Sequence, residues 1–514
     1  MMNLLTDPVF RALTPAGPIR FSLPELLSSL GKDDIESLTG LQRHQEEVFH
    51  IFLCYLAGAV LAKSGETEPS QTAAFWRTSL RRLAGRNDDS GFTLLVEDPG
   101  VPAVMQPPAS KRRVLHQDYR LKATASDTLD VLQTAKNHDV KTARASYTDS
   151  ESWCYALINL QTSSGFLGHG NYGIARMNGG FGSRVCVGWQ SEFRLGARFI
   201  RDTRRLLEQR KSLLRPPYPY QNDGQVLLWL TPWDGLDSLP LSQLDPFFIE
   251  TARRVRLIGD GRNIKVFGAP STCPRVAAKE QQGCLGDPWI PINEKKNCAL
   301  SPSELGFKPE LLRTLLLGDG YYPAAMQEPS AQDGSGWFCA SVLIRGQGTT
   351  GGFHEAAIRI PEQVRPILFG QGASHDRLAR ISRMGIEIAG DILRKILRPA
   401  LFALLQGGPN SLNMDKREVS AWVESAAAPF LNSWRLRYFD WLWTIPDEPD
   451  DNAALRPWVL ILRDLAQQTL NRAMLRAPTR GGRSYRAKTH ATGRLSMGLR
   501  KHFSGFLEEI HDRN

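Results

Sequence analysis

The chain has 514 residues, 42% of them hydrophobic and 23% charged, which is an ordinary composition for a globular protein long enough for two or more domains. Lys and Arg outnumber Asp and Glu by 63 to 53, and the resulting formal net charge of +10 favours an anionic partner. The sequence has no run of 18 apolar residues and no signal-peptide pattern, so we expect a cytoplasmic protein that does not enter a membrane.

The seven cysteines are scattered and form no CxxC pair. An odd, unpaired set is typical of a reducing compartment and predicts no disulfide framework. Cys273, Cys284 and Cys298 lie near one another, but their gaps of 11 and 14 residues and the lack of a histidine pair argue against zinc. We interpret them as small buried hydrophobic side chains and expect neither a metal nor a cofactor.

The first 370 residues are predicted to mix helices with short strands. Apolar periodicity predicts helices over residues 21–30, 46–62, 75–83, 152–162 and 193–214. Extended segments are predicted at 92–96 and 225–232, and hairpins at 256–269 and 341–360. The polar stretch 111–141 is either a functional loop or an ordinary surface loop.

Beyond residue 374 the sequence changes to four amphipathic segments of helical length, at 375–405, 417–438, 456–475 and 495–510. They predict a four-helix bundle. The fold class is therefore predicted to be α+β, with a large mixed domain over 1–370 and the bundle over 371–514. The last connection, 477–501, holds seven Lys or Arg and no acidic residue, which is typical of a phosphate-contacting arm or a disordered linker.

The most unusual stretch is 161–184, QTSSGFLGHGNYGIARMNGGFGSR, in which seven of 24 residues are glycine. This density excludes a regular helix or strand and offers bare backbone for close approach to another surface. The interleaved polar residues suit phosphate oxygens and base edges; they are Asn171, Arg176, Asn178, Ser183 and Arg184. A purely structural glycine loop is the alternative, whereas the spacing fits neither GxxxxGK[ST] nor a GxGxxG between strand and helix.

Two further clusters accompany this segment. One contains Lys279 in AAKE, followed by Gly286 to Trp289, and a lone lysine there could equally be a solvated surface charge. The other is the tip of the 341–360 hairpin, where Gln347, Thr349 and Thr350 would project from a rigid base.

Catalysis has little support in the sequence. His138 with Asp139 and His354 with Glu355 each pair a base with a carboxylate, but neighbours on a strand point to opposite faces. No HExxH or GxSxG motif and no carboxylate cluster at metal spacing is present. A general single-stranded nucleic-acid or guide-RNA binder remains the other alternative; it would need stacking aromatics, and 477–501 offers mainly Tyr485.

Taken together, these motifs resemble the CasA family, the large subunit of the type I-E CRISPR Cascade surveillance complex. The resemblance runs through most of the chain. It is carried by the NLL–D opening, PAVMQ at 102–106, the Asn-His-Asp loop at 137–139, GFLGHGNYGIARMNGGFGSR, AAKE through GDPW, and RGQGTTGG.

The resemblance implies a subunit without catalytic residues that reads a protospacer-adjacent motif in double-stranded DNA from the minor groove and starts R-loop formation. The implied partners are the backbone, small and guide-end-capping subunits, the CRISPR RNA, the target DNA and a helicase–nuclease recruited in trans. The implied DNA-binding residues are the glycine loop, a lysine finger, a wedge, a loop near the motif and the basic C-terminal connection. In this sequence they are Gly165, Phe166, Leu167, Gly168 and His169; Lys279; Gln347, Gly348, Thr349 and Thr350; Asn137, His138 and Lys141; and Arg480, Arg483 and Arg486.

Overall fold

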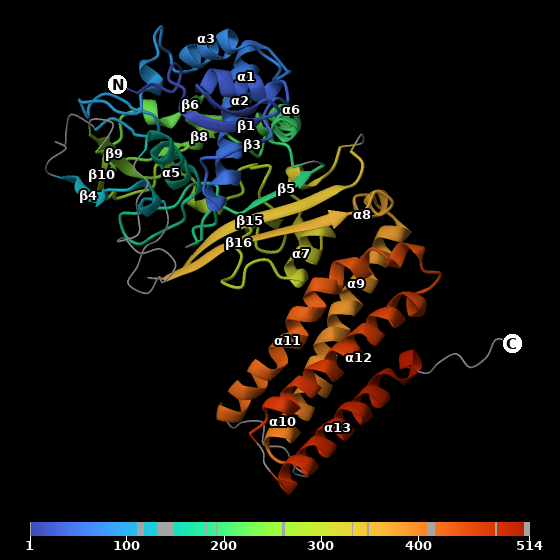
Figure 1. Ribbon diagram of the computed structural model, residues 1–514. Coiled ribbons are helices and arrows are strands. Elements are labelled where there is room, and N and C mark those ends of the chain that lie inside the picture. The colour runs from blue at the N-terminus through green and yellow to red at the C-terminus, as the bar shows by residue number, and fades with distance from the viewer. Residues whose placement is uncertain are drawn as a thin grey trace. The chain divides into compact units, whose positions relative to one another are not determined.

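The computed structural model describes residues 2–109, 118–130, 149–180, 182–191, 193–259, 263–330, 333–346, 349–408, 417–478 and 481–507, with the backbone alone at 345, 346, 349 and 350. The chain divides into two compact units, Met1–Phe307 with Gly320–Arg359 and Lys308–Asp319 with Ile360–Asn514. The first unit mixes helices and strands and the second is helical, which confirms the predicted α+β class (Figure 1). The main segment of the second unit begins at Ile360, eleven residues before the predicted boundary at 371, and the unit also takes in a short earlier helix.

The first unit is built around one buried helix, α2 (Glu46–Ser64). Every residue from Val48 to Leu61 is buried, because helices α3 (Ala73–Leu83), α5 (Ser150–Ser163) and α6 (Leu195–Leu213) pack against it. By length and composition Arg43–Ser64 could cross a membrane, but 78% of its apolar window is buried inside the protein. The apolar surface of α2 is therefore used in packing on all sides.

The five helices predicted for this part of the chain, which include α1 (Leu23–Gly31), are confirmed.

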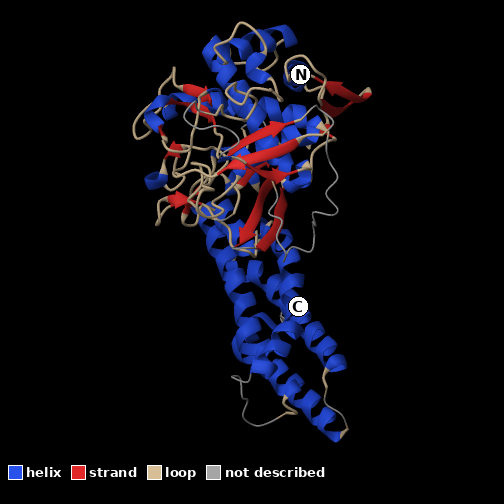
Figure 2. Ribbon diagram, turned by 90° about the vertical axis from the view of Figure 1, so that its left-hand side faces the viewer, coloured by secondary structure: helices blue, strands red, loops and turns tan. Residues whose placement is uncertain are grey.

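Small sheets surround these helices (Figure 2). Their strand orders are β2-β1-β3, β4-β10-β9, β16-β15-β5, β13-β12-β14, β6-β8 and β11-β7. The strands are β1 (Phe10–Thr14), β2 (Gly17–Phe21), β3 (Ser37–Leu38), β4 (Arg120–Ala123), β5 (Cys186–Gln190), β6 (Gln225–Leu227), β7 (Leu239–Pro240), β8 (Leu244–Ile249), β9 (Arg254–Ile258), β10 (Lys265–Ala269), β11 (Val276–Ala277), β12 (Ile292–Asn293), β13 (Cys298–Ala299), β14 (Tyr321–Tyr322), β15 (Gly336–Gly346) and β16 (Thr349–Ile360).

Both predicted hairpins are confirmed, since β9 pairs antiparallel with β10 and β15 lies beside β16. The predicted strand over 225–232 is wrong beyond Leu227, where Leu228–Leu230 forms a 3-10 turn. The reason is a side chain: Arg275 Nη2 donates to the carbonyls of Leu228 (3.1 Å) and Thr231 (3.0 Å). These carbonyls therefore bond a guanidinium instead of a neighbouring strand.

The second unit contains four long helical segments. They are α9 (Ala373–Asp391), which continues through a π-helical turn (Ile392–Leu397) into α10 (Arg398–Leu405), then α11 (Arg417–Leu442), α12 (Asp451–Arg476) and α13 (Gly482–Leu507). Short helices α7 (Pro309–Leu316) and α8 (Arg365–Leu368) precede them. Arg313 fastens α7 to α9 by donating to Ser382 Oγ and to the Ala379 carbonyl, both at 2.8 Å.

Of the two interpretations of 477–501, the disordered linker is wrong for the described residues from Gly482 onward, which form the first five turns of α13, whereas phosphate contact by this segment stays a prediction. The physical reason is a stripe of small and apolar side chains repeating every four residues, which packs on α10 and α12. The stripe consists of Ala487, Ala491, Leu495, Leu499 and Phe503, all buried. Its two alanines and the glycines around it give a weak hydrophobic signal in the sequence.

Aromatic side chains hold the centre of the second unit. The rings of Trp441 and Trp458 stack with centroids 4.7 Å apart and an interplanar angle of 16°. Trp458 Nε1 donates to the carbonyl of Gly385 on α9 (2.9 Å). A Cβ at Gly385 would lie 2.4 Å from the Trp441 ring, so only glycine allows α9 this close to the tryptophans.

We expect Gly385→Ala to lower the free energy of unfolding of the second unit by about 1–3 kcal/mol, because the added methyl group overpacks the site. Gly390→Ala is the matched control: it lies on the same helix, and its nearest neighbour is the flexible end of Arg394 at 3.4 Å. It should be neutral or stabilising. Urea unfolding of the full chain followed by tryptophan fluorescence measures both, and equal stabilities would contradict the overpacking.

Candidate nucleic-acid interface

The glycine segment, residues 161–184, follows helix α5 and folds back on itself through its backbone. Phe166 N donates to the Gly180 carbonyl (3.0 Å), and Ile174 N donates to the Ser164 carbonyl (3.0 Å). These bonds tie the two ends of the segment to each other. The backbone thus satisfies part of its own hydrogen-bonding requirement without a regular sheet.

The glycines of this segment serve two different purposes. A Cβ at Gly165 would lie 2.0 Å from the Gly182 carbonyl oxygen, and one at Gly173 would lie 2.9 Å from the carbonyl carbon of Gly165. These two positions need glycine because backbone packs directly on backbone. Gly168 has a φ of +105° and open space around its would-be Cβ, so it is required for the turn and not for packing.

The tip of the segment is a tight turn. Asn171 N donates to the Gly168 carbonyl (3.0 Å), and Leu167 N donates back to the Asn171 carbonyl (2.9 Å). Phe166, Leu167, Gly168 and His169 are all partly exposed. The structure therefore presents residues 166–169 of the predicted glycine loop at the surface of the first unit, with a bare backbone position at Gly168, whereas Gly165 is buried against the Gly182 backbone.

The two arginines of the segment point inward, and the prediction that they face a polyanion is wrong. Arg176 and Arg184 are 5% and 4% exposed. Both contact the Asp287 carboxylate: Arg176 Nε lies 3.6 Å from it, and Arg184 forms a closer ion pair. The Arg176 guanidinium also lies 3.7 Å from the centre of the Phe248 ring. Burial is tolerated here because the charges are paired and the cations rest on aromatic faces.

The polar side chains of Asn178 and Ser183 likewise hold the segment in place. Asn178 Nδ2 donates to the Ala299 carbonyl (2.9 Å). Ser183 N and Oγ donate to the Leu343 carbonyl on β15 (2.8 and 2.7 Å), while Leu343 N donates to Ser183 Oγ (3.1 Å). The prediction that these side chains contact DNA is wrong for the same reason as for the arginines: their hydrogen-bonding capacity is used inside the protein.

Lys279 lies beside the glycine segment. It is exposed at the start of a 3-10 turn (Lys279–Gln281), and no ion pair joins it to the part of the chain that the structure describes. The turn is joined to the glycine segment through Ala299, whose N–H donates to the Gln282 carbonyl (2.9 Å) and whose carbonyl accepts from Asn178. A Cβ at Gly283 would lie 2.9 Å from the carbonyl carbon of Met177, so the two backbones touch.

The β15–β16 hairpin is the third segment at this place. Leu343, the residue bonded by Ser183, lies on β15 shortly before the hairpin tip. Gln347 and Gly348 lie outside the described residues, and Thr349 and Thr350 begin β16 with their side chains undescribed. The structure thus brings together the glycine segment, the Lys279 turn and the base of the hairpin. Asn137, His138 and Lys141 fall outside the described residues.

The basic residues near the C-terminus lie in the second unit. Arg480 is outside the described residues, whereas Arg483 and Arg486 are exposed on α13, a helix that contains no acidic residue between Gly482 and Leu507. Helix α6, which also has many arginines, differs because its cations are paired with carboxylates. The pairs are Arg198–Glu47, Arg204–Glu68, Arg205–Glu328 and Arg210–Asp245.

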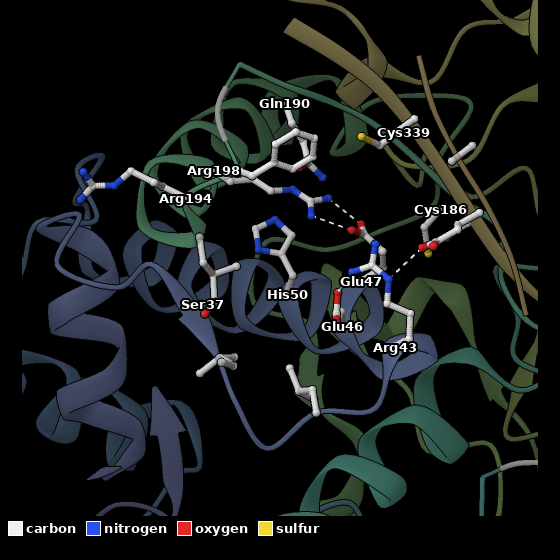
Figure 3. Close-up of a pocket in the computed structure, with 18 of the residues that line it drawn as sticks. Ser37, Arg43, Glu46, Glu47, His50, Cys186, Gln190, Arg194, Arg198 and Cys339 are labelled. Atoms are coloured by element: carbon white, nitrogen blue, oxygen red, sulfur yellow. Dashed lines mark hydrogen bonds and ion pairs between the residues drawn. The ribbon is translucent and has the colours of Figure 1, made fainter. Parts of the chain in front are cut away.

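A cavity of about 690 Å³ opens in the first unit between α2, α6, β3, β5, β15 and β16 (Figure 3). Its charges are largely paired: Arg198 donates to both carboxylate oxygens of Glu47 (2.7 and 2.5 Å), and Arg43 reaches Glu46 and Glu355. On its wall burial raises the pKa of Cys186 and of Cys339 to about 12, so both thiols stay protonated and are poor nucleophiles.

The two histidine–carboxylate pairs considered as catalytic candidates are not assembled where the structure describes them. His354 Nε2 lies 3.1 Å from the Gly351 carbonyl, whereas Glu355 pairs with Arg43 at 2.8 Å. His138 and Asp139 lie outside the described residues. Among the described residues no group of three or more His, Cys, Asp or Glu is arranged to hold a metal ion.

No family model and no curated protein matches this sequence. Solved structures do match over nearly its whole length. CasA (Cse1) of Thermus thermophilus is 14% identical with a TM-score of 0.62, covering 97% of this chain and 99% of that one. Cse1 of Acidimicrobium ferrooxidans is 13% identical with a TM-score of 0.63, covering 98% and 99%. A chain of a CRISPR RNA-guided surveillance complex is 13% identical with a TM-score of 0.59, covering 97% and 99%.

This chain has the CasA fold. Within that fold, sequence reasoning missed the residues that support the glycine segment, chiefly Asp287 and Glu250. Asp287 belongs to the Gly286–Trp289 stretch that the sequence analysis singled out, but nothing in the sequence assigns its arginine partners. Glu250 was detectable as a lone carboxylate that ends the apolar run of strand β8.

Glu250 lies under the glycine segment of the CasA fold and accepts hydrogen bonds from Ala175 N at 3.0 and 2.9 Å. Burial raises the pKa of Glu250 to about 7 from an ordinary value of 4.5. Between pH 4.5 and about pH 7 the Glu250 carboxyl group is protonated in the folded chain but ionised in the unfolded chain. The contribution of Glu250 to stability is therefore present below pH 4.5 and is lost as the pH rises to about 7.

We expect Glu250→Gln to remove this pH dependence, because the amide can still accept from Ala175 N but does not titrate. The free energy of unfolding of the wild type minus that of the variant should fall between pH 5 and pH 7, with a slope of at most about 1.4 kcal/mol per pH unit. Urea unfolding at a series of pH values measures this difference. Parallel profiles for the two proteins would show that Glu250 does not titrate in this range.

Proposed function

We propose that this chain is the large subunit of a CRISPR RNA-guided Cascade complex in antiviral defence, and that it reads a protospacer-adjacent motif in double-stranded DNA. The observation that carries the proposal is the meeting of three separate segments in a chain with the CasA fold: the glycine segment, the Lys279 turn and the base of the β15–β16 hairpin. Each of these segments was assigned a DNA-reading role by the resemblance in sequence.

The glycine segment suits the minor groove. That groove is about 6 Å wide, so an element that enters it must be thin. Gly168 has no side chain and open space around it, and the inward direction of Arg176 and Arg184 leaves the tip free of bulky cations. Backbone N–H and C=O groups at the tip would then contact the groove, while Phe166, Leu167 and His169 flank them.

Lys279 would supply the cation that reaches the acceptors on the groove floor. It is exposed, and its turn is fixed to the glycine segment through Ala299. Because the acceptor pattern of the minor groove distinguishes mainly A·T from G·C pairs, readout there is degenerate. Several related motifs should therefore be accepted.

The hairpin tip would separate the first base pair next to the motif. The sequence puts residues 347–350 at this tip, and the strands β15 and β16 give it a rigid base. Opening one step costs on the order of a few kcal/mol. Phosphate contacts and the first guide–target base pairs would offset that cost, since R-loop formation is otherwise near balance. The loop with Asn137, His138 and Lys141 would act near the motif.

In this role the chain itself cleaves nothing. It would assemble with the backbone, small and guide-end-capping subunits and with the CRISPR RNA, and it would help to recruit a helicase–nuclease that cuts the target. Arg480, Arg483 and Arg486 would contact phosphates of the DNA. Helix α13 also favours a second candidate, a general single-stranded nucleic-acid binder, because it places the exposed cations Arg483 and Arg486 close to Tyr485, which is 78% exposed.

A binding assay with a duplex library tests the proposal against this alternative. The library is randomised over the base pairs that flank a guide-matched site, and the guide complex is reconstituted with and without this chain. We expect a short flanking motif to be enriched only when the chain is present. Equal binding of all flanking sequences would leave a nonspecific scaffold, and binding that is unaffected by omission of the chain would refute the proposal.

We expect Gly168→Asp to abolish motif-dependent duplex binding while the complex still assembles, because the substitution puts a carboxylate beside the phosphates. Gly168→Asn is the matched control, since it has the same size and meets the same backbone strain at φ +105° without the charge. A gel-shift assay should give a clearly larger loss for Asp than for Asn. Equal affinities of both variants and the wild type would exclude this tip from the DNA contact.

A further inference from the structure

Strand β4 carries a basic edge that the proposed function leaves unused. It is the outer strand of the β4-β10-β9 sheet, and its residues Arg120, Leu121 and Lys122 are all exposed. Charged side chains at a sheet edge also discourage pairing with another strand, so the position of these two cations relative to the glycine segment is what distinguishes them. These residues lie in the polar stretch 111–141, but outside its Asn-His-Asp loop at 137–139 and outside the residues to which the resemblance assigns DNA binding.

The sheet is fastened to the glycine segment at one end. Just after β10, Ser271 N donates to the Gly170 carbonyl (3.1 Å), and a Cβ at Gly170 would lie 2.7 Å from the Pro270 ring. Arg254 of β9 holds the same corner by donating to the Pro270 carbonyl (2.8 Å). The sheet and the glycine segment are therefore joined to each other at this corner.

The register of the sheet puts the two cations of β4 near that corner. Arg120 is opposite Gly268 in the register. Gly268 is two residues before Pro270, so at a strand rise of about 3.3 Å per residue roughly 7 Å of strand separates Gly268 from Pro270. Lys122 lies across the same glycine, since a Cβ at Gly268 would be 2.9 Å from Lys122 Cγ. Gly268 has no side chain, and this leaves room for the lysine stem.

Neither cation is neutralised by the described residues. No carboxylate there forms an ion pair with Arg120 or Lys122, and the half-buried Asp118 that precedes them has an interaction of its own. By contrast Arg256, on the same sheet, is buried and donates to the carbonyls of Gln106 and Val101, both at 2.9 Å. Arg256 therefore stabilises the fold, whereas Arg120 and Lys122 are exposed to solvent.

We propose that Arg120 and Lys122 form a phosphate-binding strip that continues the glycine segment and positions the duplex against its tip. The inference rests on the proposed function. It adds residues that contact only the sugar–phosphate backbone of double-stranded DNA, so they contribute to affinity and register but carry no sequence information.

The test is the double variant Arg120→Gln/Lys122→Gln, assembled in the full guide complex and titrated with guide-matched duplexes at several salt concentrations. We expect affinity at 0.15 M salt to fall roughly 10- to 30-fold, and the slope of log K against log salt to become shallower by about 0.9 for each phosphate that is no longer neutralised. The preference among flanking motifs should stay unchanged. Lys265→Gln is the matched control, because Lys265 is an exposed lysine at the opposite end of β10.

The outcomes separate the two proposals. Absence of motif-dependent binding by the wild type would overturn the proposed function itself. Motif-dependent binding that is sensitive to Gly168→Asp but has the same salt slope in the double variant would overturn the phosphate strip alone. An equal loss in Lys265→Gln would overturn it as well, since the effect would then reflect total charge. A retained affinity in Arg120→Lys/Lys122→Arg would support the strip, because that variant keeps both charges.

Discussion

One carboxylate carries the internal support of the glycine segment. Asp287 neutralises two guanidinium groups, Arg176 and Arg184, that the segment sends into the core. Removal of this single charge would leave two buried cations without a carboxylate partner, and uncompensated buried charges destabilise proteins by several kcal/mol. The path of the segment, and with it the position of Gly168, therefore depends on this ion pair.

The direction of these arginines determines what the segment can offer to a partner. With the side chains of Arg176, Arg184, Asn178 and Ser183 engaged inside the protein, the tip of the segment offers backbone at Gly168 flanked by Phe166, Leu167 and His169 and no Lys or Arg side chain. Positive charge for the proposed DNA contact must then come from other elements, and the turn joined to the segment through Ala299 carries the exposed cation Lys279. The protein separates the groups that hold the loop from the groups that could bind a polyanion.

Local patterns in the sequence were sufficient for the elements but not for the directions of side chains. The apolar run of α2 and the glycine turns of two hairpins predict those elements correctly, because periodicity and turn chemistry are local. Arg184 could not be assigned from the sequence, since its partner Asp287 is distant along the chain and only the fold brings them together. Helix α13 was predicted only from residue 495 onward; its first turns were missed because Ala487 and Ala491 make a buried stripe that adds little hydrophobic signal.

The close packing of Gly165 on Gly173 also affects how quickly the tip of the glycine segment can bind and release a ligand. A loop whose backbone is bonded at several points has little conformational freedom left to lose when it meets a ligand. Binding to such a loop then requires no prior ordering of the backbone. A ligand that fits poorly can therefore dissociate without delay. In the proposed role, in which the chain tests many DNA sites to find one, a rigid loop would shorten the search even where it adds nothing to the final affinity.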